Sequence, residues 1–194
     1  MYLKYLIEDH KHIDMNNIDY GDSHDDIVFF KKHAPKNVTP EEQHALTIYT
    51  RQSKKINGSI WNNTGEYKTL LNHISNGLKK SPIASEDFHI YTGINANKNI
   101  LSGKLHIPSF ISTSINPYIA TDFVESAKKR HTTEMMQDEH GNNVEHTIHH
   151  VIKIHVKKGQ HIGGYIADIS KIPEEKEFLI NKGHTLHFTG KYKD

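Results

Sequence analysis

The sequence of 194 residues contains no cysteine. Disulfides, thiolate nucleophiles and cysteine-based metal sites are therefore excluded together, and a reducing compartment is compatible with this composition. Long apolar runs are also absent, since no stretch approaches the roughly 20 apolar residues that span a bilayer. Residues 1–9 lack the apolar run of a signal peptide. We therefore expect a soluble cytoplasmic protein, of its own cell or of a cell that it enters, without a membrane partner.

A strong charge of one sign is lacking too, because 24 Lys and Arg balance 23 Asp and Glu to a formal net charge of +1. No strong field therefore favours nucleic acid as a partner. Arginine is nearly missing: Arg51 and Arg130 are the only two, and the codon bias of an AT-rich genome explains this most simply. A hydrophobic content of 35% at this length is typical of one globular unit, which we expect to be a monomer.

Histidine is plentiful, with 17 residues, and raises the question of a metal ion. The densest group is His146, His149 and His150, beside a strand-like run. A zinc site needs ligands at helix or hairpin spacing, as in His-Glu-x-x-His, and the sequence contains no such pattern. We therefore predict no metal site.

The order of the predicted elements indicates an α+β domain. A polar lead-in over residues 1–38 is expected to pack on a main domain over residues 39–194, in which helices come first and strands later. Helices are predicted from apolar spacing, and strands from runs of β-branched and aromatic residues. The predicted helices cover residues 39–56, 66–80 and 118–130, and the predicted strands cover residues 88–92, 109–114, 150–156, 162–166, 177–180 and 185–188. We expect mostly antiparallel pairing, and a mobile polar loop over residues 131–143.

The first helix has a clear start in the sequence. Thr39 can cap it, Pro40 suits the first helical position, and Glu42 completes a capping box. Gly58 predicts its end shortly after residue 56.

Two glutamates stand two positions apart in Glu175-Lys176-Glu177, directly before an apolar run. In an extended strand such residues point to the same face, so both carboxylates would face one cleft while Lys176 faces away. Two carboxylates on the same side of a cleft raise each other's pKa and can take different roles in catalysis. The alternative is a solvated acidic loop, which the apolar run over residues 178–180 disfavours.

Ser112-Thr113-Ser114 ends a predicted strand with three hydroxyl groups. Ser112 and Ser114 would point to one face, where they could hydrogen-bond a carboxylate or a ribose. The alternative is that these hydroxyl groups cap the helix that starts after Asn116-Pro117.

Four motifs occur in a defined order along the chain. They are Tyr49-Thr50 with Ile56-Asn57, Tyr91-Thr92-Gly93, Phe110 to Pro117, and Glu175 to Gly183. In this order they resemble the mono-ADP-ribosyltransferases of the bacterial-toxin and phage type, the class recognised by an arginine, a Ser-Thr-Ser and a Glu-x-Glu. The resemblance covers roughly residues 40 to 190. It implies a helical lead-in packed on two antiparallel sheets that form a cleft for NAD.

The resemblance also implies NAD as the substrate, no metal cofactor, and roles for individual residues. Glu177 would stabilise the oxocarbenium-like transition state and hydrogen-bond the nicotinamide-side ribose. Ser112 would hold Glu177 in place, and Glu175 would orient and partly deprotonate the acceptor. The implied NAD-binding residues are Tyr49, Arg51, Asn57, Tyr91, Thr92, Gly93, Thr113, Ser114 and Phe123.

A glutamate at position 175 implies, within this family, a protein acceptor with an arginine side chain. Three alternatives use the same fold. An NAD glycohydrolase would use water as the acceptor, another transferase would use RNA or a small molecule, and a degenerate binding module would bind a partner without catalysis.

Thr92 stands where the family has an arginine that contacts the NAD phosphates and braces the cleft. A threonine has no charge to offer to a diphosphate. Arg51, Arg130 or a lysine such as Lys98 would have to replace it. We predict Arg51, because it lies on the helix that contains the motif residues Tyr49 and Asn57.

Overall fold

The computed structural model describes residues 2–8, 23–97, 103–130, 136–137, 143–144 and 147–189. Within the loop expected at residues 131–143, two short strands are described, β5 (Met136–Gln137) and β6 (Asn143–Val144), which pair with each other. The rest of that loop, His146 and Lys98 lie outside the described residues, and so do the predictions made for them.

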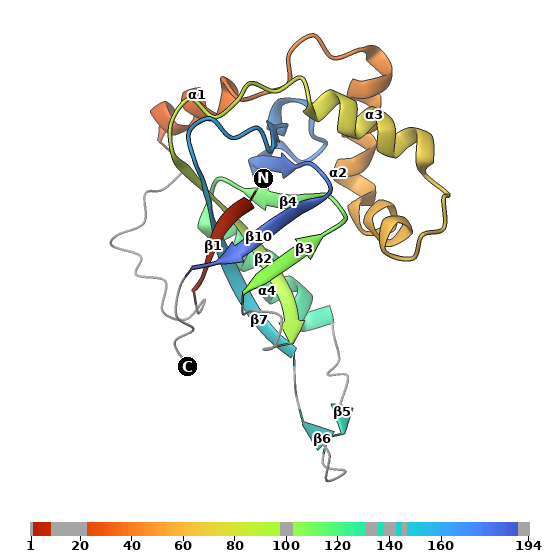
Figure 1. The fold of residues 1–194 in the computed structure, drawn as a ribbon, viewed down its shortest axis with the longest axis vertical. Coiled ribbons are helices and arrows are strands. Elements are labelled where there is room, and N and C mark those ends of the chain that lie inside the picture. The colour runs from red at the N-terminus through yellow and green to blue at the C-terminus, as the bar shows by residue number, and fades with distance from the viewer. Residues whose placement is uncertain are drawn as a thin grey trace.

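The described helices are mostly those expected from the sequence. They are α1 (His24–Lys31), α2 (Pro40–Trp61), α3 (Lys68–Leu78) and α4 (Pro117–Arg130) (Figure 1). Among the α-helices, only α1, which lies in the lead-in, was not predicted. Figure 1 shows α2 and α3 close together at the upper right and α1 at the upper left.

Helix α2 begins as the sequence predicts, but it ends later. The Thr39 backbone N–H donates to Glu42 Oε2 at 2.8 Å and the Glu42 backbone N–H donates to Thr39 Oγ1 at 3.3 Å, so the capping box is present. The predicted end near residue 56 is wrong, because α2 continues to Trp61. Gly58 does not stop the helix, since Ile56 beside it is fully buried and packing outweighs the low helix propensity of one glycine.

The main strands form one hydrogen-bonded run in the order β3-β10-β1-β7-β2-β4-β9-β8. Their bounds are β1 (Tyr2–Glu8), β2 (Phe88–Asn97), β3 (Lys104–Ile107), β4 (Ile111–Ser114), β7 (Thr147–Val156), β8 (Gly163–Tyr165), β9 (Glu177–Ile180) and β10 (His184–Phe188). A single residue pair, Tyr91 with Ser114, joins β2 to β4, so the run divides into a five-stranded and a three-stranded sheet. Among the described strands, every pairing except β1 with β10 is antiparallel. The expected α+β fold with helices on two antiparallel sheets is confirmed.

The lead-in contributes a strand to the larger sheet. β1 pairs with β10 on one side and with β7 on the other. Helix α1 follows, with a capping box between Ser23 and Asp26, and it buries Phe30. Neither element was predicted, although residues 2–7 contain tyrosine and isoleucine, which favour strands. The division of the chain at residue 38 stays a prediction.

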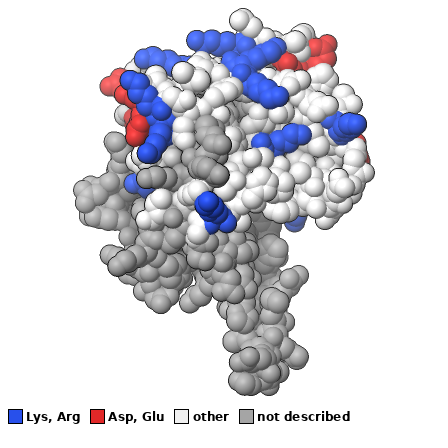
Figure 2. Space-filling view, in the orientation of Figure 1, with Lys and Arg blue, Asp and Glu red and all other residues white. Residues whose placement is uncertain are grey.

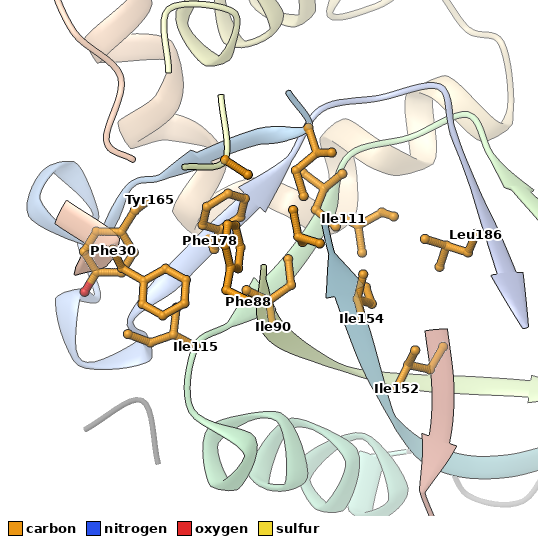
Figure 3. Close-up of a cluster of buried hydrophobic side chains, with 14 of the residues drawn as sticks. Phe30, Phe88, Ile90, Ile111, Ile115, Ile152, Ile154, Tyr165, Phe178 and Leu186 are labelled. Atoms are coloured by element: carbon orange, nitrogen blue, oxygen red, sulfur yellow. The ribbon is translucent and has the colours of Figure 1, made fainter. Parts of the chain in front are cut away.

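Two buried clusters hold the helices and sheets together. The first lies between α1 and both sheets, and Figure 3 shows its largest members, among them Phe30, Phe88, Ile90, Ile154 and Phe178. The second packs α2 and α3, through Leu46, Tyr49 and Ile74, against Leu179 of β9 and against Phe110, which directly precedes β4. Because neighbouring residues of a strand point to opposite sides, Phe178 enters the first cluster and Leu179 the second. Glu177 shares the side of Leu179, so its side chain faces α2.

β2 and α4 approach each other closely at Gly93. A Cβ atom at this position would lie 2.5 Å from Val124 Cγ2 and 2.9 Å from the carbonyl oxygen of Ala120. Two positions earlier, Tyr91 packs against the same two residues of α4. The missing side chain of Gly93 therefore allows α4 to lie directly on β2.

We expect Gly93→Ala to lower the free energy of unfolding by about 1–3 kcal/mol, because the added methyl group overlaps α4. Urea denaturation followed by circular dichroism measures the change. The matched control is Gly58→Ala in α2, where no heavy atom lies within 4 Å of the added Cβ atom. Helix propensity favours alanine there by up to about 1 kcal/mol. Equal stability of Gly93→Ala and the wild type would contradict the close contact.

Candidate active site

Four side chains from α2, β4 and β9 form a chain of hydrogen bonds. On α2, Asn57 Nδ2 donates to the Tyr49 hydroxyl group at 3.0 Å. That hydroxyl oxygen lies 3.2 Å from Ser112 Oγ on β4. Ser112 in turn hydrogen-bonds the carboxyl group of Glu177, at the start of β9. The chain of hydrogen bonds therefore connects the helical layer to the smaller sheet.

The number of available protons determines which group donates in each of these hydrogen bonds. An ionised carboxylate only accepts, so the single hydroxyl proton of Ser112 goes to Glu177, and Ser112 Oγ accepts from Tyr49. Tyr49 is fully buried, and burial, followed by the charge of Glu177, raises the pKa of its phenol far above the ordinary value. Tyr49 therefore keeps its proton. Asn57 Nδ2 also donates to the carbonyl oxygen of Phe110 at 3.1 Å, which fixes the amide at the start of the chain.

Glu177 is a buried ionisable group, with 4% of its surface exposed. Burial is the main cause that raises the pKa of its carboxyl group to about 7. The hydrogen bond from Ser112 lowers this pKa, and the charge of Glu175 raises it. A carboxyl group with such a pKa is close to half ionised at neutral pH. Perturbed groups of this kind concentrate at functional sites.

Glu175 and Glu177 do not share one extended strand, and that prediction from the sequence is wrong. Pro173 starts a 3-10 helix that ends at Glu175, and Lys176 has a left-handed backbone conformation with φ of 48°. β9 begins only at Glu177. The prediction assumed a period of two, whereas the fixed φ of proline suits the turn that forms here. The two carboxyl groups are still close enough for the charge of Glu175 to raise the pKa of Glu177.

Glu175 is less enclosed than Glu177, since its side chain is half-buried. Burial raises the pKa of the Glu175 carboxyl group, and the charge of Glu174 raises it as well. Its backbone is fixed, because Ser114 Oγ donates to the Glu175 carbonyl oxygen at 2.8 Å. Two neighbouring carboxyl groups in different environments can take different roles. The buried one can stabilise a charge, and the accessible one can exchange a proton with an incoming molecule.

The Ser-Thr-Ser motif contributes both to the candidate site and to the cap before α4, the two alternatives expected from the sequence. Ser112 belongs to the chain of hydrogen bonds, and Thr113 faces the other side and donates to a carbonyl oxygen of β9. Ser114 accepts from the Asn116 backbone N–H at 3.0 Å and so caps the segment that leads into α4. The site and the helix cap therefore use neighbouring residues of one strand end.

Thr92 is occupied by a structural hydrogen bond. It is buried, and its Oγ1 donates to the carbonyl oxygen of Ser112 at 2.8 Å. This bond ties β2 to β4 beside their single pairing at Tyr91 and Ser114. The hydroxyl proton of Thr92 is therefore used within the protein and is not presented to a diphosphate.

Arg51 lies apart from the chain of hydrogen bonds. It is exposed, and it follows Tyr49 by two residues, which places it about 200° around the helix from Tyr49. A kink with φ of −125° at Gln52 follows directly. The side chain of Arg130 lies outside the described residues. Phe123 is 39% exposed on α4, where a ligand can reach it.

A cavity of about 590 Å³ lies between α1 and the start of β2, and neither Ser112 nor Glu177 lines it. Its charged lining is mainly acidic: Asp25, Asp26, Glu86 and Asp87, with Lys153 as the opposing cation. Like charges repel strongly at short range, so this cavity is unsuited to a diphosphate.

Two further findings hold for the part of the chain that the structure describes. No three His, Asp or Glu side chains are placed there to share a metal ion. None of the described helices combines the length and the apolar character needed to cross a membrane.

A known family matches this sequence over most of its length. A profile of the ADP-ribosyltransferase exoenzyme family matches residues 29–192. The chain therefore belongs to this family, whose substrate is NAD. No curated protein matches the sequence.

Solved structures of several ADP-ribosyltransferases share the fold. An ADP-ribosyltransferase toxin from Paenibacillus larvae is 19% identical with a TM-score of 0.57, over 81% of this chain and 82% of that one. The Vis toxin from Vibrio splendidus, in complex with agmatine, is 18% identical with a TM-score of 0.55, over 88% and 86%. An ADP-ribosyltransferase from Clostridium botulinum is 17% identical with a TM-score of 0.53, over 84% and 92%. At these identities the likeness establishes the fold.

The structure brings most of the residues chosen from the sequence into one place. Those in contact around the site are Tyr49, Asn57, Thr92, Ser112, Ser114, Glu175 and Glu177. Tyr91 and Gly93 pack on α4 instead, Thr113 faces away, and Arg51 lies outside the group. The Phe110 carbonyl oxygen, which fixes Asn57, was missed because a backbone acceptor has no residue signature.

Glu177 is expected to make the folded state less stable as the pH rises. Its folded pKa of about 7 lies above the ordinary value of 4.5, so folding favours the protonated form. This stabilisation is complete below the ordinary value and is lost as the pH rises through the folded pKa. Glu177→Gln, which resembles the protonated form, should therefore be more stable than the wild type above about pH 8, by up to about 3 kcal/mol.

Urea denaturation near pH 4.5 and above about pH 8 measures the free energy of unfolding of the variant and the wild type. The control is Glu66→Gln, at an exposed glutamate outside the site, which should keep the pH dependence of the wild type. If Glu177→Gln also keeps that dependence, Glu177 is not an ionised group buried in the folded protein.

Proposed function

We propose that this protein transfers ADP-ribose from NAD to a protein acceptor, with an arginine side chain as the acceptor, and releases nicotinamide. The observation that most directly supports this is the buried carboxyl group of Glu177. Ser112, Tyr49 and Asn57 hold it in place, beside the more accessible Glu175. Membership of the family supports ADP-ribosyl transfer as the reaction.

The bond that breaks joins the nicotinamide nitrogen to C1′ of the ribose. Its electron pair leaves with nicotinamide, and positive charge develops on the ribose in an oxocarbenium-like transition state. An ionised Glu177 beside that ribose would hydrogen-bond a ribose hydroxyl group and stabilise the developing charge. Ser112 assists, because its hydrogen bond lowers the pKa of Glu177 against the effect of burial.

Glu175 is assigned to the acceptor in this proposal. Its half-buried position and its pKa, which burial raises, suit a group that accepts a proton from an incoming nucleophile. A guanidinium nitrogen of the acceptor attacks C1′, forms the new carbon–nitrogen bond and loses one proton to Glu175, which passes it to water. The similar Vis toxin was solved in complex with agmatine, itself a guanidinium compound, which supports this choice of acceptor.

The diphosphate of NAD requires a cation that Thr92 does not supply. A charge-assisted hydrogen bond contributes about 1.5–3 kcal/mol. Helix α2 presents Arg51, the residue chosen from the sequence, and Lys54, and both are exposed. Lys54 precedes Asn57 by three residues and is therefore its neighbour on the helix surface. Arg51 stays a candidate, and Lys54 lies closer to the chain of hydrogen bonds.

A second candidate function is binding without catalysis. The observation that favours it is Thr92, which stands where the resemblance implies an arginine and donates its hydroxyl proton to the Ser112 carbonyl oxygen. The intact arrangement of Ser112, Glu175 and Glu177 opposes it.

Incubation of the protein with a cell lysate and NAD labelled in its adenylate part tests the proposal. We expect labelled protein bands that neutral hydroxylamine removes, as it does from ADP-ribosylated arginine. Free labelled ADP-ribose without a labelled band would indicate a glycohydrolase. Unchanged NAD would indicate the binding function.

Substitution of the two glutamates separates their roles. Glu177→Gln should lower both protein labelling and NAD hydrolysis by about 10²–10³ or more, because it removes a preorganised stabiliser of the transition state. Glu175→Gln should lose protein labelling and keep most of the NAD hydrolysis, because water needs less activation than a guanidinium group. Release of nicotinamide and labelling of protein, measured in parallel, give the two rates.

Glu66→Gln, at an exposed glutamate outside the site, is the control for both variants and should keep both activities. Equal loss of the two activities in Glu175→Gln would mean that Glu175 acts on NAD itself. Activity of Glu177→Gln near that of the wild type would remove Glu177 from the mechanism.

A further inference from the structure

Trp61 is the only tryptophan of the chain, and it is 59% exposed at the end of α2. It follows Asn57 by four residues, so it lies about 6 Å farther along the helix and about 40° around it. Residues with this spacing are neighbours on a helix surface. Asn57 is the first member of the chain of hydrogen bonds that leads to Glu177. Trp61 therefore lies one helical turn from the residue where the chain of hydrogen bonds begins.

A cation lies next to the same part of α2. Lys54 is exposed and precedes Asn57 by three residues, about 60° around the helix. Lys54, Asn57 and Trp61 therefore form a stripe along α2, consisting of a cation, a member of the site and an exposed aromatic ring. Lys and Arg side chains are also distributed over the helical part of the face in Figure 2. An anionic dinucleotide would meet the positive charge of Lys54 at this stripe, whereas the cavity near α1 is lined by four carboxylates.

Resting on the proposed function, we propose that the indole ring of Trp61 stacks on the adenine of NAD. The nicotinamide ribose would then lie at Ser112 and Glu177, and the diphosphate would pass Asn57 and Lys54. Trp61 would act as a specificity residue, because it favours the dinucleotide over nicotinamide mononucleotide, which has no adenine. Stacking on an aromatic side chain accepts any base and strengthens its binding by about tenfold or more.

The fluorescence of Trp61 reports on this contact directly, since no other tryptophan is present. Addition of NAD to the intact protein should quench the fluorescence to saturation, with the midpoint that calorimetric titration gives. ADP-ribose should quench it as well, and nicotinamide mononucleotide should not. Unchanged fluorescence at an NAD concentration that saturates the calorimetric signal would overturn the proposal.

Substitution gives an independent test. Trp61→Ala should weaken NAD binding and raise the KM for NAD by about tenfold, with kcat nearly unchanged, because the adenine is remote from the bond that breaks. Hydrolysis of nicotinamide mononucleotide should be the same in this variant and the wild type. Trp61→Tyr should restore most of the affinity for NAD, because a smaller ring still stacks. It also guards against a folding defect in the alanine variant.

The matched control is Ile83→Ala, at an apolar residue that is 60% exposed outside α2, and it should keep the NAD affinity of the wild type. Equal affinities of Trp61→Ala and the wild type would overturn the role of Trp61. The two proposals can fail separately. Lack of NAD binding by the wild type overturns both, whereas NAD turnover with unchanged Trp61 fluorescence overturns the stacking alone.

Discussion

The hydrogen bond between Ser112 and the carboxyl group of Glu177 is the interaction on which the candidate site depends. Burial makes the charged form of Glu177 costly, and Ser112 is the group that opposes this cost. Tyr49 lies against Ser112 Oγ and leaves the hydroxyl proton of Ser112 for Glu177, and Asn57 donates to Tyr49 in turn. α2, β4 and β9 must therefore keep their relative positions for the carboxyl group to be ionised at neutral pH.

The packing of the protein maintains these positions. β9 alternates between the two clusters, since Phe178 enters one and Leu179 the other, and this alternation turns Glu177 toward α2. The two sheets meet at one residue pair, and the bond from Thr92 to the Ser112 carbonyl oxygen reinforces that junction. The resemblance implies a charged side chain at position 92. In this protein Thr92 instead holds the strand that contains Ser112.

Sequence reasoning succeeded where the signal is local. The capping box at Thr39, the apolar run of β9 and the Ser-Thr-Ser strand end are short patterns with a direct structural meaning. It failed where contacts between residues far apart in the sequence determine the local structure. Burial extends α2 past Gly58, β1 forms because β7 and β10 flank it, and the turn at Pro173 breaks the strand expected through Glu175. The hydrogen-bond partner of Thr92 is likewise visible only in the folded chain.

The most direct test is an NMR titration of the Glu177 side-chain carboxyl carbon in the wild type and in Ser112→Ala. We predict a pKa of about 7 in the wild type and a higher pKa in the variant, because the variant loses the hydrogen bond that favours the charged form. A pKa near the ordinary 4.5 in the wild type would contradict the burial of this group. The same pKa in both proteins would contradict its dependence on Ser112.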